Sequence, residues 1–121
     1  MAAPNDHRLH AEGLDVGPRN VAGALRDGEI QLVDVREPEE WDAGRIAGAR
    51  HIPLGQIAAE AGSLDTGRPV VFYCRVGSRS TMAADAFRRA GFDAYSMAGG
   101  VQRWAEEGRA LTPDDGFVAD H

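Results

Sequence analysis

The chain has 121 residues, of which 43% are hydrophobic and 26% are charged. This length and balance indicate one globular domain with its own core. The net charge of -6 at pH 7 argues against a nucleic-acid partner, because such partners are bound largely by basic surface. No apolar run approaches the about 20 residues that span a bilayer, and the first residues lack the pattern of a secretion signal. We therefore expect a cytoplasmic protein with no membrane partner.

The cysteine and lysine counts narrow the possible chemistry. Cys74 is the only cysteine, so the chain can form neither an internal disulfide nor a multi-cysteine metal site. All 13 basic residues are arginine, which excludes a lysine Schiff base and a lysine-containing phosphate loop. Arginine can still bind oxyanions through paired N–H groups. We expect no metal and no cofactor, and Cys74 is either a buried structural thiol or a reactive one.

Strand-like and helix-like segments alternate along the first half of the chain. Hydrophobic periodicity and the Pro and Gly signals predict strands at 14–16, 30–35 and 50–52, and helices at 18–28, 38–43 and 54–61. The helix at 38–43 is expected to carry Trp41 inward. Residues 1–13 are expected to form a polar tail and 111–121 an acidic tail, which leaves 14–110 as the domain.

A strand, a thiol and a helix follow one another in the second half. The run 70–73 is β-branched and aromatic, which predicts a buried strand that ends at Cys74. A polar turn with Gly77 leads into residues that recur at helical spacing over 81–90. A further strand at 94–97 and a further helix at 101–107 complete the pattern.

This alternation argues for an α/β fold with a mainly parallel sheet. In open sheets of this kind, ligands bind at the carboxyl ends of the strands. Cys74 and Asp34 both lie at or near such ends, so we expect the functional site there. The free N–H groups at the start of the helix after Cys74 would favour negative charge on its sulfur.

Four stretches, taken together and in order, resemble the rhodanese-homology domain. They are LVDVRE at 32–37, GRIAGARHIP at 44–53, CRVGSRS at 74–80 and MAGGVQRW at 97–104. The resemblance covers residues 14–109 and implies a three-layer fold with a central, mainly parallel five-stranded sheet flanked by helices. Arg45 departs from the pattern, since many members have histidine there. That position belongs to the architectural part of the pattern, so we do not expect the chemistry to change.

The resemblance also implies a catalytic role for Cys74, which would carry a sulfane sulfur as a persulfide. The loop that binds substrate and persulfide would consist of Arg75, Val76, Gly77, Ser78, Arg79 and Ser80. The backbone N–H groups of 75–79 are implied to surround the sulfur. Ser78 and Ser80 could donate hydroxyl hydrogen bonds or cap the helix, and we favour capping.

Sulfur transfer requires a largely ionised thiol, because the thiolate is the nucleophile. Arg75 and Arg79 supply cations near Cys74 and the following helix supplies its dipole, so we predict a thiolate at neutral pH. Asp34 and Arg36 are expected to support the loop. Asp34 would do so by hydrogen-bonding the loop backbone or by pairing with an arginine.

We expect a sulfurtransferase that takes sulfur from thiosulfate, a small sulfur-containing anion, or from a persulfide donor. Cyanide or a thiol would accept it. No second cysteine can resolve the persulfide within the chain, so the acceptor is external and the kinetics should be ping-pong. The alternative is a sulfur carrier or regulatory interaction module that receives persulfide from a sulfur-relay partner protein.

Phosphatases and arsenate reductases of the same architecture offer a further alternative. Their loops separate a cysteine from an arginine by five residues. Here four residues, 75–78, separate Cys74 from Arg79, and Ser80 stands where the longer loop would have its arginine. The shorter loop favours a single sulfur atom over a phosphate.

Overall fold

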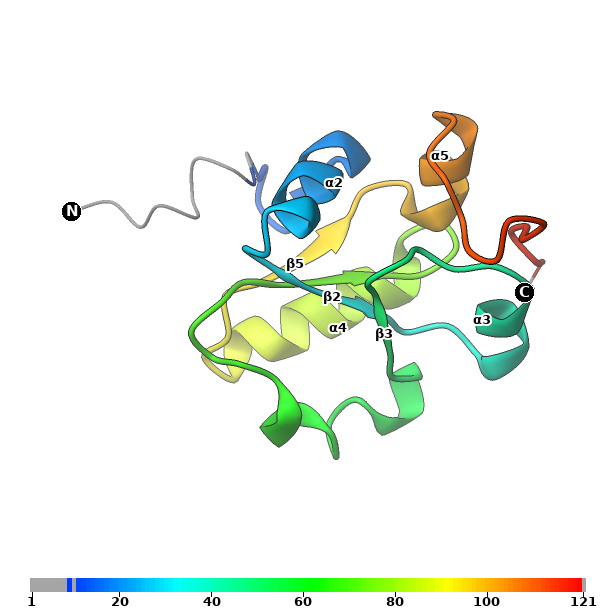
Figure 1. Ribbon diagram of the computed structural model, residues 1–121. Coiled ribbons are helices and arrows are strands. Elements are labelled where there is room, and N and C mark those ends of the chain that lie inside the picture. The colour runs from blue at the N-terminus through cyan, green and yellow to red at the C-terminus, as the bar shows by residue number, and fades with distance from the viewer. Residues whose placement is uncertain (1–8, 10, 121) are drawn as a thin grey trace.

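The computed structural model describes residue 9 and residues 11–120. At its centre lies one parallel sheet of five strands in the order β1-β5-β4-β2-β3. The strands are β1 (Asp15–Val16), β2 (Gln31–Asp34), β3 (Arg50–His51), β4 (Val70–Tyr73) and β5 (Ala94–Met97). The helices are α2 (Pro18–Arg26), α3 (Pro38–Ala43), α4 (Ser78–Arg89) and α5 (Gly100–Glu106). The expected fold, a five-stranded sheet flanked by helices, is confirmed (Figure 1).

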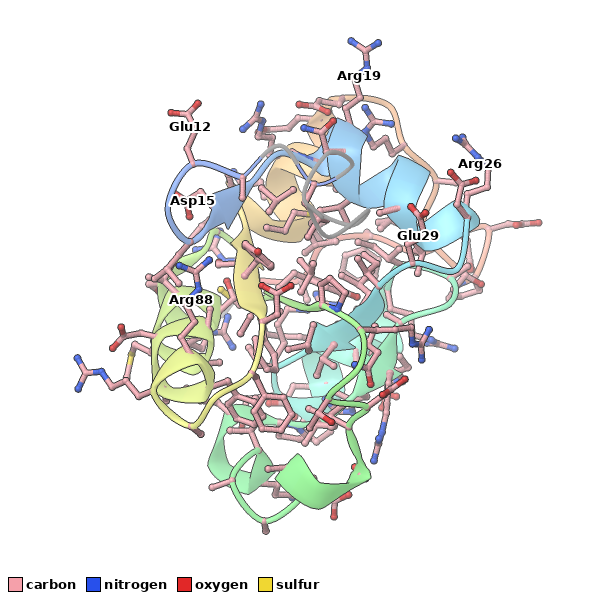
Figure 2. The ribbon with its side chains drawn as sticks, turned by 90° about the vertical axis from the view of Figure 1, so that its left-hand side faces the viewer. Glu12, Asp15, Arg19, Arg26, Glu29 and Arg88 are labelled. Carbon is pink, nitrogen blue, oxygen red and sulfur yellow. The ribbon has the colours of Figure 1, made fainter. Side chains whose placement is uncertain are left out.

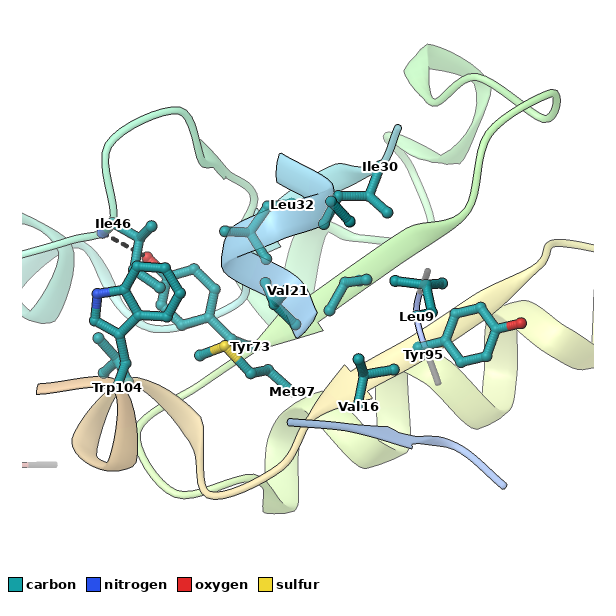
Figure 3. Packing of buried hydrophobic residues seen from close by; sticks show 13 residues of the cluster. Leu9, Val16, Val21, Ile30, Leu32, Ile46, Tyr73, Tyr95, Met97 and Trp104 are labelled. Atoms are coloured by element: carbon teal, nitrogen blue, oxygen red, sulfur yellow. Dashed lines mark hydrogen bonds between the residues drawn. The ribbon is translucent and has the colours of Figure 1, made fainter. Parts of the chain in front are cut away.

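The sheet separates two hydrophobic clusters, because strand side chains alternate between its faces. On one face Val71 and Tyr73 pack in a cluster that includes residues of α2 and α5, and the Tyr73 hydroxyl accepts a 3.2 Å hydrogen bond from the Ile46 N–H (Figure 3). On the other face Val70 and Phe72 pack with residues of α4. The helices α2 and α5 therefore form one outer layer and α4 the other.

No helix among the described residues is long and apolar enough to cross a membrane.

The helix expected over 54–61 is wrong. The chain forms two short 3-10 turns instead, η1 (Leu54–Gln56) and η2 (Ala61–Ser63). Ile57 is the one buried residue of the expected helix, and Gly55 lies inside it. A single buried side chain gives too little tertiary packing to offset the cost of nucleating a helix through a glycine.

The helix α3 has the expected bounds, but it buries Glu40 where we expected Trp41. Glu37 and Glu40 form a capping box, in which the Glu37 N–H donates to Glu40 Oε1 at 3.0 Å. Trp41 is half-buried, and its ring stacks on His51 with 4.8 Å between ring centroids. The Arg45 guanidinium lies 4.9 Å from the centroid of the same ring. Trp41 therefore packs at the surface, and Glu40 points to the interior.

The edge strand β1, near the N-terminus of the chain, is held in place partly by α4. Most of the expected N-terminal tail, residues 1–8 and 10, lies outside the described residues. Leu9 is buried in the cluster that includes α2 and α5. Arg88 of α4 donates to the carbonyl oxygen of Gly13 at 2.9 Å and to that of Ala94 at 2.8 Å, beneath the turn that leads into β1 (Figure 2). The edge strand β1 is thus held by α4 as well as by β5.

The C-terminal segment 111–120 packs beside α3. Thr112 and Arg45 exchange two backbone hydrogen bonds, of 3.0 and 2.7 Å, and the Phe117 N–H donates to Ala43 O at 3.0 Å. A Cβ atom added to Gly44 would lie 2.5 Å from Phe117 O. The domain boundary at residue 110 stays a prediction, but the segment beyond it is attached to the domain at these points.

We predict that Gly44→Ala lowers the free energy of unfolding by about 1–3 kcal/mol, because the added methyl group overpacks the contact with Phe117. Gly55→Ala is the matched control, since a Cβ atom there meets nothing within 4 Å, and we expect a change within about 0.5 kcal/mol. Equilibrium unfolding in urea measures both. Equal stability of the two variants would contradict the packing of the C-terminal segment on Gly44.

Candidate active site

Cys74 lies at the carboxyl end of β4, the central strand of the sheet. Its side chain is fully buried among residues of the cluster that includes α4. The chain then turns at Gly77, whose φ of 122° is readily adopted only by glycine, and α4 begins at Ser78. The short turn brings the first residues of α4 back toward the sulfur.

Two backbone N–H groups donate hydrogen bonds to the Cys74 sulfur. The donor nitrogen of Gly77 lies 3.1 Å from Sγ and that of Ser80 lies 3.4 Å from it. The Ser80 hydroxyl oxygen lies 3.5 Å from the same sulfur. Donors held in fixed positions stabilise negative charge without having to reorganise. The observed donors are thus Gly77 and Ser80, where the resemblance implied the whole run 75–79.

The preference for helix capping by Ser78 or Ser80 is wrong. Gly77 occupies the N-cap position of α4, and no side chain of the described residues caps that end. Ser80 is buried, and its hydroxyl donates to Gly77 O at 3.2 Å. The same hydroxyl lies 2.7 Å from Ser96 Oγ, on β5. Of the two roles considered for Ser80, capping the helix and donating a hydroxyl hydrogen bond, the structure is therefore consistent with donation.

The backbone of α5 holds the opposite side of the loop. The N–H groups of Val101 and Gln102 donate to the carbonyl oxygens of Cys74 and Arg75, at 2.9 and 3.0 Å. Gly100 makes this approach possible, because a Cβ atom there would collide with both carbonyl groups. The start of α5 and the cysteine loop are therefore packed backbone to backbone.

Arg79 is held by a carboxylate of α3. Its guanidinium makes two hydrogen bonds with Glu40, Nη1 to Oε1 at 2.8 Å and Nη2 to Oε2 at 3.1 Å. The Glu40 side chain is fully buried, and that of Arg79 is 19% exposed. The hydrogen bonds that Arg79 donates to Glu40 raise the pKa of Arg79. The charge of Arg79 is therefore balanced by a buried partner, which the sequence interpretation did not foresee.

Arg75 lies on the solvent-facing side of the loop. Its Nη1 donates to Gln102 Oε1 at 2.8 Å. With Leu111, Phe117 and other residues, Arg75 lines a groove of about 410 Å³ between α5 and the C-terminal segment. Phe117 is 61% exposed there. The loop thus has a buried sulfur on one side and a partly apolar, open flank on the other.

Asp34 and Arg36 form a fully buried ion pair, with 2.7 Å between Arg36 Nη2 and Asp34 Oδ2. Of the two alternatives for Asp34, the structure shows pairing with an arginine. Burial alone would lower the pKa of Arg36, but its hydrogen bonds and charge interaction with Asp34 raise it. The Arg36 guanidinium also lies 5.6 Å from the ring centroid of Tyr73, the residue before Cys74. The pair therefore lies beside the end of β4, next to the loop.

Four residues that contact the loop were not singled out from the sequence: Glu40, Ser96, Gly100 and Gln102. Two of them have sequence features that could have identified them. Ser96 is a polar residue in an apolar strand, and Gly100 belongs to a Gly-Gly pair at a strand-to-helix turn. Glu40 stood among other acidic residues and gave no sign of being buried. Among the described residues, no three His, Cys, Asp or Glu side chains form a group that could hold a metal ion.

The family model of the rhodanese-like domain matches residues 18–107. The uncharacterized protein YqhL of Bacillus subtilis is 42% identical over 77 residues, which cover 63% of this chain and 61% of that protein. The probable adenylyltransferase/sulfurtransferase MoeZ of Mycobacterium tuberculosis is 40% identical over 91% of this chain, but over only 28% of its own length. The chain therefore spans less than two thirds of either of these two relatives. The thiosulfate sulfurtransferase GlpE of Pseudomonas aeruginosa is 37% identical over 78% of this chain and 83% of its own.

Solved structures that superpose on this chain include a rhodanese-related protein, in agreement with the family model. A rhodanese-related protein from Thermoplasma volcanium superposes with a TM-score of 0.76 and 26% identity, over 81% of this chain and 96% of that one. A protein from Bacillus halodurans superposes with a TM-score of 0.79 and 25% identity, over 98% of this chain and 92% of that one. Because the family model matches most of the length of the chain, the chain belongs to the family of rhodanese-like domains.

Proposed function

We propose that the protein is a sulfurtransferase that moves a sulfane sulfur through a persulfide on Cys74. The observation that carries this proposal is the pair of backbone donors, Gly77 and Ser80, that converge on the Cys74 sulfur at 3.1 and 3.4 Å. A similar relative, GlpE, is named a thiosulfate sulfurtransferase, which supports thiosulfate as the donor. The loop that would hold substrate and persulfide is Arg75, Val76, Gly77, Ser78, Arg79 and Ser80.

In the first half-reaction, the Cys74 thiolate attacks the outer sulfur of thiosulfate. A bond forms between the two sulfurs, the sulfur–sulfur bond of thiosulfate breaks, and sulfite leaves with the bonding electron pair. The persulfide keeps one negative charge on its terminal sulfur. The N–H groups of Gly77 and Ser80 stabilise the Cys74 thiolate before transfer. The dipole of α4 favours negative charge near the start of the helix both before and after transfer.

In the second half-reaction, an external acceptor takes the terminal sulfur. Cyanide attacks it to give thiocyanate, or a thiolate attacks it to give a new persulfide, and the electron pair returns to Cys74 as thiolate. Since Cys74 is the only cysteine, each turnover needs a separate acceptor and the kinetics are ping-pong. We place this reaction in the cytoplasm, where thiols are kept reduced and Cys74 stays available.

A sulfur carrier is the second candidate. MoeZ, whose name combines adenylyltransferase and sulfurtransferase, aligns with this chain over 28% of its length, so a domain of this kind also occurs as part of a larger protein. In that role Cys74 would receive its sulfur from a partner protein and pass it to another. The groove beside Arg75, with its exposed Phe117, is consistent with a small acceptor such as cyanide or a thiol and also with a partner protein.

Phosphate chemistry has less support from the geometry. Ser80 stands where a phosphate-binding loop of this architecture has its arginine. The neighbouring Arg79 bonds to Glu40 through both of its terminal nitrogens. The two backbone donors converge on a single sulfur atom. The arrangement therefore suits a transferred sulfur better than a tetrahedral oxyanion.

We predict that excess thiosulfate without an acceptor releases one sulfite per chain, because the persulfide cannot discharge. Adding cyanide should convert this single release into continuous turnover with parallel double-reciprocal plots. Cys74→Ser should release no sulfite. Sulfite from that variant would contradict the proposal, whereas loading only from a cysteine desulfurase would favour the sulfur carrier.

We also predict that Arg79→Met lowers the free energy of unfolding by about 3 kcal/mol, because it removes the cation that pairs with the buried Glu40 carboxylate. The matched control is Arg89→Met on the same helix, where the pair with Asp85 is exposed and a change within about 0.5 kcal/mol is expected. Chemical denaturation followed by circular dichroism measures both. Equal effects of the two substitutions would refute the special role of the Glu40 pair.

A further inference from the structure

A chain of hydroxyl groups leads from the Cys74 sulfur to the next strand. Ser80 Oγ lies 3.5 Å from Cys74 Sγ and 2.7 Å from Ser96 Oγ. The Thr81 hydroxyl donates to Ser96 Oγ at 3.4 Å. Ser80 and Ser96 are 0% and 1% exposed, so both hydroxyls are shielded from water. A buried hydroxyl needs hydrogen-bond partners, and here these partners connect it to the sulfur.

The position of Ser96 explains how its side chain reaches the site. Its neighbours in β5, Tyr95 and Met97, belong to the cluster that includes α2 and α5. Because side chains alternate along a strand, Ser96 faces the other side of the sheet, where α4 and Cys74 lie. It is therefore a polar residue placed inside an otherwise apolar layer, directly beneath the first turn of α4.

Counting protons gives the hydrogen bonds a direction. Each serine hydroxyl has one proton to donate. Within the part of the chain that the structure describes, Ser80 Oγ is the acceptor that the Ser96 hydroxyl reaches, since Thr81 already donates to Ser96. If Ser96 donates to Ser80, the proton of Ser80 is free to point to Gly77 O or to Cys74 Sγ.

We propose that Ser96 is a positioning residue that directs the Ser80 hydroxyl toward the Cys74 sulfur when that sulfur is negatively charged. This inference rests on the proposed function, because that chemistry requires a charged sulfur. With the thiol protonated, the Ser80 proton turns to Gly77 O. With the thiolate, it turns to the Cys74 sulfur as a third donor beside the two backbone N–H groups. Hydrogen bonds in series strengthen one another, so Ser96 increases the donor strength of Ser80.

Charged groups also lie around the loop that holds the sulfur. Arg79 on the loop pairs with Glu40 of α3, and Arg75 bonds to Gln102 of α5. On the side of β2 lies the Asp34–Arg36 pair. Removing the Ser96 hydroxyl changes none of these charges. A change in the ionisation of Cys74 after that substitution would therefore report on the hydroxyl chain.

The test compares Ser96→Ala, Ser80→Ala and the double variant with the unmodified chain. The rate of Cys74 alkylation by iodoacetamide is followed against pH, because only the thiolate reacts. We expect each single substitution to move the alkylation midpoint to higher pH and to lower the rate of sulfur loading from thiosulfate at pH 7 by about tenfold, the effect of losing one hydrogen bond to a charged group. The double variant should match Ser80→Ala, since both residues act through one hydroxyl. Ser63→Ala, an exposed hydroxyl in η2, is the control and should change neither readout.

Two results would overturn the inference. An alkylation midpoint unchanged in Ser96→Ala would show that Ser96 only fills space. Additive effects in the double variant would show that the two serines act separately. If Ser96→Ala does not fold, Ser96→Gly, which also lacks the hydroxyl, takes its place. An unchanged alkylation midpoint in either Ser96→Gly or Ser80→Ala would then overturn the inference. Alkylation needs no sulfur donor, so absence of sulfur loading in the unmodified chain would count against the proposed function and not against the hydroxyl chain.

Discussion

The site depends on holding one sulfur atom between the end of a buried strand and the first turn of a helix. Cys74 ends the central strand β4, and the turn at Gly77 is short enough for the N–H groups of Gly77 and Ser80 to reach its sulfur. These donors belong to the backbone, so their positions are set by the fold and not by mobile side chains. A parallel sheet with the helix directly after the strand supplies both of these donors from the backbone.

Three neighbouring elements keep the loop in this shape. From α3, the buried Glu40 carboxylate holds Arg79, and from α5 two backbone N–H groups hold the carbonyl oxygens that follow β4. From β5, Ser96 contacts the Ser80 hydroxyl. Each contact is wholly or partly buried, where an unpaired polar group is costly, so each resists a change in the loop. These contacts therefore hold the two backbone donors in place at the Cys74 sulfur.

Most of the secondary structure could be predicted from the sequence, because strong local patterns mark it. The strand at 70–73 and the helix at 38–43 have the bounds that their residues indicate. The helix at 54–61 failed because helical composition does not reveal how few of its side chains are buried. The position of the functional loop, directly after Cys74, could also be predicted. The residues that bond to the side chains of Arg79 and Ser80 could not. Glu40 and Ser96 come from other elements of the fold, α3 and β5, and only the tertiary structure brings them to the first turn of α4.

The central claim is that Cys74 carries the transferred sulfur. Its most direct test is the intact mass of the protein after exposure to thiosulfate and removal of the excess. The account predicts a gain of one sulfur atom that maps to the peptide containing Cys74, disappears on treatment with cyanide and is absent from Cys74→Ser. A protein whose mass stays unchanged after thiosulfate, polysulfide and a persulfide donor would contradict it.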